Sequence, residues 1–207
     1  MTRMLGCKMS KLDGTERKIT KNLTNKVPTK YSFQDYMPPI TDQGTTNMCV
    51  THAIASFLNW VTDMKLKTSR KDNKVNIDEI YSIREDKNHD NGMTIKEALS
   101  YVKRHGVKSG SGLLKISDYA MVGSEQILKQ AILCNGPCLI ALPVYDSTRD
   151  DFWNGAELEG GHCVAVVGYD EEGFIIRNSW GTSYGSHGYG KLPYQDFKKV
   201  KECWTII

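Results

Sequence analysis

The sequence predicts an α+β fold built as two lobes. Apolar residues recur at helical intervals in the first half of the chain, whereas the second half reads as a series of short strands. With 207 residues, the chain is long enough for one sizeable domain or for two small lobes that share a substantial core. No internal repeat or low-complexity tract interrupts this pattern.

Three helices are expected before the strands begin. Apolar side chains lie three or four positions apart over 50–64. A second helix is predicted over 94–106, with Thr94 as N-cap, Glu97 in the capping-box position and Gly106 as the stop. A third runs over 124–136, from a serine to a Gly-Pro pair.

The rest of the chain is predicted to form strands. The two strands that flank Asp170 to Gly173 form a hairpin, with its turn at those four residues. The expected strands are 138–145, 162–170, 173–180, 188–193 and 202–207. A helical half therefore precedes a β-rich half, and a cleft between the two is a natural place for a site.

Charge and hydropathy exclude some classes of function. The formal net charge of +3 is too small to indicate a nucleic-acid or membrane surface. It is unevenly spread, since residues 1–30 carry +6 and the remainder −3. No apolar run reaches the ~18 residues of a membrane span, and residues 1–18 lack the apolar centre of a signal peptide. We therefore expect a cytoplasmic protein, and nothing in the sequence indicates an oligomeric state.

Six cysteines in such a chain are expected to be reduced. Three residues separate Cys134 from Cys138, and no second Cys or His pair follows at zinc-finger distance. Two ordinary thiols at a strand edge explain them better than a metal site, so neither a metal nor an organic cofactor is expected.

Cys49 opens the apolar run of the first helix and has two interpretations. A small buried core residue is one; a nucleophile whose thiolate is stabilised by the helix dipole is the other. A nucleophile needs a base, and His52, one turn along the helix, could reach the thiol. His162 is favoured, because it follows Gly160 and Gly161 at the head of a strand. Asn178, across the hairpin, could hydrogen-bond its far nitrogen.

These residues resemble a known family, the papain-like cysteine peptidases. The segment DQGTTNMC at 42–49 resembles their nucleophile segment, and GGHCVAVVGYDEEGFIIRNSWGTSYGSHGYG at 160–190 resembles their His and Asn segments. DNGMTIKEALSYVKRHGV at 90–107 resembles the glycine-containing loop and second helix. The resemblance extends from about residue 31 to about residue 192.

The resemblance implies a papain-like two-lobe fold, with a helical lobe at about 31–125, an antiparallel β-barrel-like lobe at about 126–207 and the active-site cleft between them. It makes Cys49 the nucleophile and His162 the general base and acid. Asn178 would orient His162, and Gln43 would complete the oxyanion hole. For the substrate-binding residues it implies Gly92, Met93, Gly161 and Trp180, the last covering the His–Asn hydrogen bond.

The sequence departs from the family at two positions near the nucleophile. Val50 replaces a common Trp, and Thr46 stands where many members carry a disulfide-bonded cysteine. The chain thus resembles the compact, disulfide-poor members found in microbes and viruses. Residues 1–30 are either a loosely packed basic extension or a short propeptide that lies over the cleft.

The resulting hypothesis is a cysteine-type endopeptidase that cleaves a protein or peptide substrate through a thioester acyl-enzyme. Two alternatives remain open. The cleft could bind peptides without catalysis, or the same scaffold could act as an acyl transferase or amidase.

Overall fold

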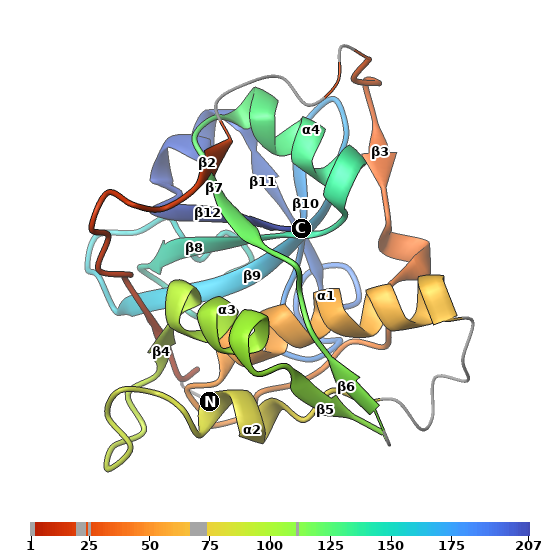
Figure 1. The fold of residues 1–207 in the computed structure, drawn as a ribbon. Helices are drawn as coiled ribbons and strands as arrows, with labels where there is room; N and C mark the ends of the chain where they lie inside the picture. The colour runs from red at the N-terminus through yellow and green to blue at the C-terminus, as the bar shows by residue number, and fades with distance from the viewer. Residues whose placement is uncertain (1–2, 20–23, 25, 67–73, 111) are drawn as a thin grey trace.

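The computed structural model describes residues 3–19, 24, 26–66, 74–110 and 112–207, and the remainder of the N-terminal segment lies outside this range. Figure 1 shows a central sheet with α4 on one side and α1 on the other. The helices are α1 (Cys49–Leu66), α2 (Ile77–Tyr81), α3 (Ile95–Arg104) and α4 (Glu125–Asn135), with 3-10 turns at Gln34–Tyr36 and Tyr194–Lys199. The three predicted helices are confirmed; the short α2 was not predicted.

The helix ends follow the predicted capping residues. Thr94 caps α3 and accepts from the backbone N–H of Glu97, whose carboxylate accepts from the backbone N–H of Thr94, which completes a capping box. Ser124 caps α4 by accepting from the backbone N–H of Ile127. Local sequence therefore determines where these two helices begin.

Twelve strands are present in the described residues, more than the five expected from the sequence. They are β1 (Cys7–Lys8), β2 (Lys18–Ile19), β3 (Tyr31–Ser32), β4 (Met93–Thr94), β5 (Val107–Ser109), β6 (Gly112–Leu114), β7 (Tyr119–Val122), β8 (Cys138–Val144), β9 (Gly160–Tyr169), β10 (Gly173–Arg177), β11 (Tyr189–Pro193) and β12 (Glu202–Ile206). The unpredicted strands have two to four residues each, too few for a period of two to stand out from chance.

The main sheet runs in the order β11-β10-β9-β8-β12-β7-β2, and β3 also pairs with β9. Its outer strands, β11 and β2, do not pair with each other in the described residues, so the expected barrel-like lobe is an open sheet. It is also not wholly antiparallel, because β2 joins β7 in parallel. Since β3 and β7 lie in this sheet, it draws on residues before the boundary near 125, and the division into two lobes stays a prediction.

The β9–β10 hairpin has its turn where the sequence predicted it, between Tyr169 and Gly173. A register shift lies between Ile175 and Ile176, close to the end of β10. The hairpin places His162, near the start of β9, close to Asn178, which directly follows β10. Its geometry therefore brings together two of the predicted site residues.

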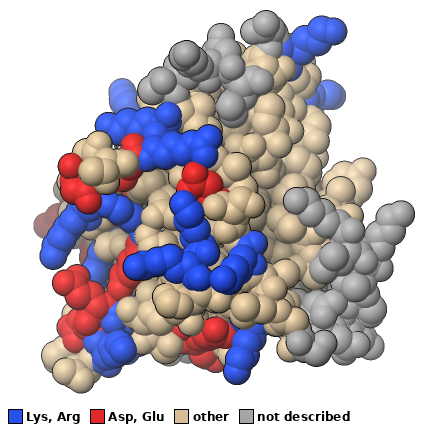
Figure 2. Space-filling view, viewed as in Figure 1, with Lys and Arg blue, Asp and Glu red and all other residues tan. Residues whose placement is uncertain are grey.

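The N-terminal segment is attached to the body by charged side chains. Lys96 of α3 forms ion pairs with Asp13 and Glu16, at 3.5 and 2.6 Å, and Arg17 contacts Asp118 at 2.7 Å. Figure 2 shows cationic and acidic side chains interleaved on this face of the molecule. No helix among the described residues is both long and apolar enough to cross a membrane.

Candidate active site

Cys49 is the first residue of α1, and its side chain is completely buried. Its sulfur accepts hydrogen bonds from the backbone N–H groups of Val50, Cys163 and Gly6. Burial, and then the nearby thiol of Cys7, raises the pKa of Cys49 to about 12, while the three N–H groups oppose the shift. In this arrangement the thiol is protonated, despite its place at a helix N-terminus.

His162 precedes Cys163, whose backbone N–H donates to the Cys49 sulfur. Its Nε2 is 2.7 Å from Oδ1 of Asn178. An amide oxygen can only accept, so Nε2 carries the proton and Nδ1 keeps a free lone pair. Nδ1 is buried and has no hydrogen-bond partner among the described residues. The imidazole is therefore held in the tautomer that a base requires.

Aromatic side chains enclose this imidazole. The ring of Trp180 stacks on His162 with centroids 4.5 Å apart, and Phe152 meets it edge-on at 5.4 Å. Burial lowers the pKa of His162 to about 4, against the hydrogen bond with Asn178, which favours the charged form. The His162–Asn178 pair is thus shielded from water, with Trp180 where the sequence analysis expected it.

Gln43 is tied to the same structure through Ser179, the residue after Asn178. Its Oε1 accepts from the Ser179 hydroxyl at 2.7 Å, and its backbone N–H donates to the Ser179 carbonyl at 2.8 Å. These bonds direct Nε2 away from Ser179. Nε2 donates to the carbonyl of Thr46 at 2.8 Å and to that of Met4 at 3.0 Å. The donor that the sequence assigned to an oxyanion is therefore occupied by two backbone carbonyls, one of which belongs to the chain's own N-terminal segment.

Residues 3–10, here called the strap, extend across the site. Arg3 lies 5.4 Å over the ring of Trp180 and contacts Asp42 at 3.7 Å. At the other end, the backbone N–H and the hydroxyl of Ser10 both donate to the carboxylate of Glu202. Between these anchors the strap buries Cys49.

The strap touches the three remaining residues that the sequence assigned to substrate binding. The N–H of Met93 donates to the carbonyl of Gly6 at 2.9 Å, as part of the parallel pairing of β1 with β4. A Cβ on Gly92 would lie 1.9 Å from the Gly6 oxygen, and one on Gly161 would lie 2.3 Å from the Cys7 oxygen. The absence of side chains at both glycines lets the strap backbone approach this closely.

The other residues weighed from the sequence lie elsewhere. Nδ1 of His52 pairs with the hydroxyl of Thr41 at 2.9 Å, and its ring faces a separate cavity. Cys138 is buried in β8 and Cys134 is exposed at the end of α4. The described residues contain no group of three or more His, Cys, Asp or Glu side chains placed to hold a metal ion.

Comparison with known proteins decides the family. The model of the papain family of cysteine proteases matches residues 88–204, more than half of the chain. The chain belongs to this family. The papain-family match contains the His and Asn segments but begins after Cys49 and Gln43, so the placement of those two residues rests on the structure described above.

Papain-family relatives match over parts of their length. An uncharacterized peptidase C1-like protein of Acanthamoeba polyphaga mimivirus is 33% identical over 94 residues, which are 38% of this chain and 30% of that protein. Cathepsin Q of Rattus norvegicus is 29% identical over 124 residues, or 50% of this chain and 36% of its own. The aligned segments thus span about a third of these curated relatives.

Solved structures confirm the papain-like fold. Xylellain, a cysteine protease from Xylella fastidiosa, superposes with a TM-score of 0.81 at 22% identity, covering 98% of this chain and 95% of its own. A Carica candamarcensis cysteine protease in complex with E-64 gives 0.69 at 19% identity, covering 87% and 98%.

Sequence reasoning missed the contacts of the strap and the link from Ser179 to Gln43. Gly6 offered a faint signal, since a glycine in a polar basic segment permits a close backbone approach. A Cβ there would lie 1.9 Å from the carbonyl oxygen of Asn47. The predicted site residues are brought together beneath the strap. The strap belongs to the segment 1–30, for which the sequence allowed two interpretations, a basic extension or a propeptide.

Proposed function

We propose that this chain is a cysteine endopeptidase that hydrolyses peptide bonds through Cys49, His162 and Asn178. The observation that carries the proposal is the orientation of His162, whose Nε2 is fixed by Asn178 while Nδ1 lies free and buried next to the residue that contacts the Cys49 sulfur. Core packing gives no reason to bury an imidazole with a free lone pair on the residue next to one that contacts a thiol at a helix N-terminus.

In the first half of the reaction, Nδ1 of His162 takes the proton of the Cys49 thiol, and the thiolate attacks the carbonyl carbon of the substrate. The carbonyl oxygen becomes an oxyanion, for which Nε2 of Gln43 is the donor. The C–N bond then breaks, and the imidazolium gives its proton to the leaving amine. A thioester on Cys49 remains.

Water completes the cycle. His162 takes a proton from the water as its oxygen attacks the thioester carbon, and the C–S bond breaks to release a carboxylic acid. The proton returns to the sulfur, so the enzyme is regenerated with no net change. Asn178 acts by holding the imidazole in place; without it, the ring could turn and present the wrong nitrogen.

The strap keeps this machinery latent in the intact chain. The carbonyl of Met4 takes the Gln43 donor, and the N–H of Gly6 points at the sulfur. A nucleophile needs a carbonyl carbon, and an N–H in that position offers nothing to attack. The strap therefore occupies the site without being a substrate, which supports the propeptide interpretation of residues 1–30.

The test uses an epoxide that alkylates activated thiols, with intact mass as the readout. It is carried out in a Gly6→Ala background, which is designed to loosen the strap. We expect one label per chain, none with Cys49→Ala, and labelling slowed at least ~100-fold with His162→Ala, by the general scale of acid–base catalysis. Cleavage of a peptide substrate should follow the same order.

Two results would count against the proposal. Equal labelling with and without His162 would mean that the pair is not coupled, and the cleft would then be a binding site. A second such result is rapid labelling of Cys49 combined with transfer of the acyl group of the peptide substrate to an added amine. If the substrate were not hydrolysed without that amine, the chain would be an acyl transferase.

A further inference from the structure

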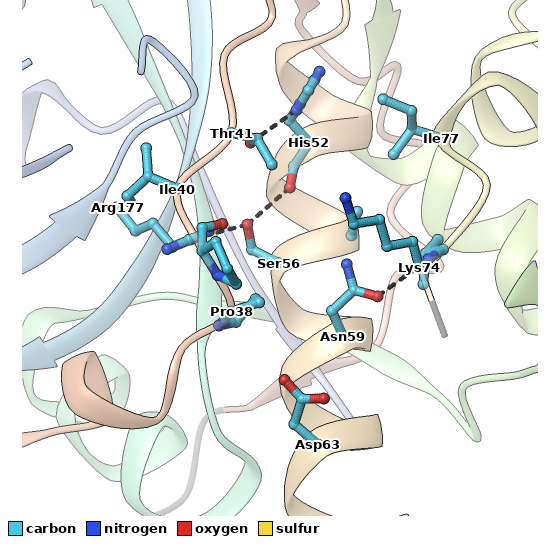
Figure 3. A pocket seen from close by; sticks show the side chains of 13 residues that line it. Pro38, Ile40, Thr41, His52, Ser56, Asn59, Asp63, Lys74, Ile77 and Arg177 are labelled. Carbon is cyan, nitrogen blue, oxygen red and sulfur yellow. Dashed lines mark hydrogen bonds between the residues drawn. The ribbon is translucent and has the colours of Figure 1, made fainter. Parts of the chain in front are cut away.

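A cavity of about 340 Å³ lies beside α1, and Cys49 is not among its lining residues (Figure 3). One wall is formed by successive turns of α1, from His52 through Ser56 and Asn59 to Asp63. The chain at 38–41 and the chain at 74–77 form the facing walls. The volume is in the range of small-molecule sites in proteins.

Arg177 supplies an unusual charge at this cavity. It is 3% exposed, and its guanidinium donates to three neutral acceptors. These are the Ser56 hydroxyl at 3.1 Å, the Tyr189 hydroxyl at 3.0 Å and the Pro39 carbonyl at 2.6 Å. No ion pair joins Arg177 to a carboxylate among the described residues. A buried cation without an anion is costly, and two of its five N–H groups remain for another acceptor.

Two further donors line the cavity, Asn59 on α1 and Lys74 on the facing chain at 74–77. Oδ1 of Asn59 accepts from the backbone N–H of Val75 at 3.1 Å, which leaves its Nδ2 without a partner among the described residues. Lys74 lines the cavity and forms no ion pair with those residues. Figure 3 shows the side-chain nitrogens of Asn59 and Lys74 on the side of the cavity facing Arg177. An anion between Arg177 and Lys74 would have donors on both sides.

The remaining lining residues make the two ends of the cavity chemically different. Asp63 lies two helical turns beyond Ser56, so the one carboxylate among the described lining residues is far from Arg177 along α1. Pro38, Ile40 and Ile77 provide apolar walls. The cavity therefore suits a molecule with one anionic group and an apolar body.

We propose that this cavity binds a small organic carboxylate, with its anionic group between Arg177 and Lys74 and its apolar part against Pro38, Ile40 and Ile77. The inference does not depend on peptidase activity. The ligand would contact Arg177, which is next in the chain to Asn178, the residue that orients His162.

The test measures binding of phenylacetate to the full chain carrying Cys49→Ala, which prevents self-cleavage. Phenylacetamide, of nearly the same shape but uncharged, is the matched control ligand. Thermal unfolding is followed at constant ionic strength, and dissociation constants are measured by calorimetry. When phenylacetate exceeds its dissociation constant tenfold, the stabilisation is about 1.4 kcal/mol. We then expect the melting temperature to rise by about 3–6 °C, with no comparable rise for the amide.

Substitution of Lys74 localises the effect, since loss of Arg177 could unfold the chain by leaving buried acceptors unpaired. Lys74 is exposed, so Lys74→Met is expected to fold normally and to weaken phenylacetate binding at least about threefold. Lys18→Met, an exposed lysine on β2, is the matched control and should leave binding unchanged. Equal shifts with phenylacetate and phenylacetamide, or unchanged binding in Lys74→Met, would overturn the proposal.

Discussion

Gly6→Ala should release the strap from the cleft. Gly6 lies so close to the neighbouring loop that an added Cβ would be 1.9 Å from the carbonyl oxygen of Asn47. That oxygen belongs to the backbone just before α1 and has little room to move. The strap, held at the edge of the fold by a few hydrogen bonds, is the part that gives way.

The size of the effect follows from the bonds that the displaced strap loses. Near Gly6 these are the bonds from Met93 to the Gly6 carbonyl, from Gln43 to the Met4 carbonyl, and from the Gly6 N–H to the sulfur of Cys49. At about 1 kcal/mol each, they amount to about 3 kcal/mol. Because 1.4 kcal/mol is a factor of ten, the open population should rise about 100-fold.

The assay is the second-order rate of epoxide labelling at Cys49, followed by intact mass, together with hydrolysis of a peptide substrate. Gly123→Ala is the matched control, since a Cβ at Gly123 would meet no atom within 4 Å. We expect Gly6→Ala to label about 100-fold faster than wild type, and Gly123→Ala to label within twofold of it. Equal rates for the two variants, with both folded, would refute the claim that the strap gates the site.

Further predictions concern the site and its supports. Asn178→Ala in the loosened background should lower kcat at least ~10-fold with little change in KM, because a buried hydrogen bond that orients His162 is lost. The folded-state pKa of His162 is depressed to about 4, so this residue contributes stability above pH 6.5 that is lost as the pH falls from 6.5 towards 4. Urea unfolding should show that the free energy of unfolding of wild type falls by ~2–3 kcal/mol more than that of His162→Asn over this range. Glu202→Gln, which removes the charge that holds Ser10, should speed labelling ~10-fold, and a rate equal to wild type would exclude this anchor. Thr94→Ala should lower the free energy of unfolding by ~1 kcal/mol, measured in urea, while Thr94→Ser retains it.

Much of the scaffold could be predicted because its signals are local. The helix that begins at Cys49 is an apolar run with a 3.6-residue period, and Thr94 and Ser124 cap the next two long helices with their own side chains. The β9–β10 hairpin is equally local. Its turn forces His162 and Asn178, sixteen residues apart, to face each other.

Other features could not be read from the sequence because they depend on distant contacts. β1 and β2 have two residues each, and their partners β4 and β7 lie roughly a hundred residues away, so no periodicity marks them. The open edges of the main sheet could not be predicted for the same reason, since they too depend on which distant strands pair. Burial by the strap also reverses the expected effect on the thiol, raising the pKa of Cys49 where a helix N-terminus alone would lower it.

The sequence by itself determined which groups are available for chemistry: a thiol at a helix start, an imidazole and an amide paired by a hairpin, and a glutamine shortly before the thiol. Tertiary structure alone decided that the strap covers them and that Arg177 lines a cavity without pairing with any carboxylate in the part of the chain that the structure describes. The reason is physical. Hydrogen-bonding and capping preferences act between neighbours in the chain, whereas burial and the balance of charge are set by everything that packs around a side chain, wherever in the sequence it lies.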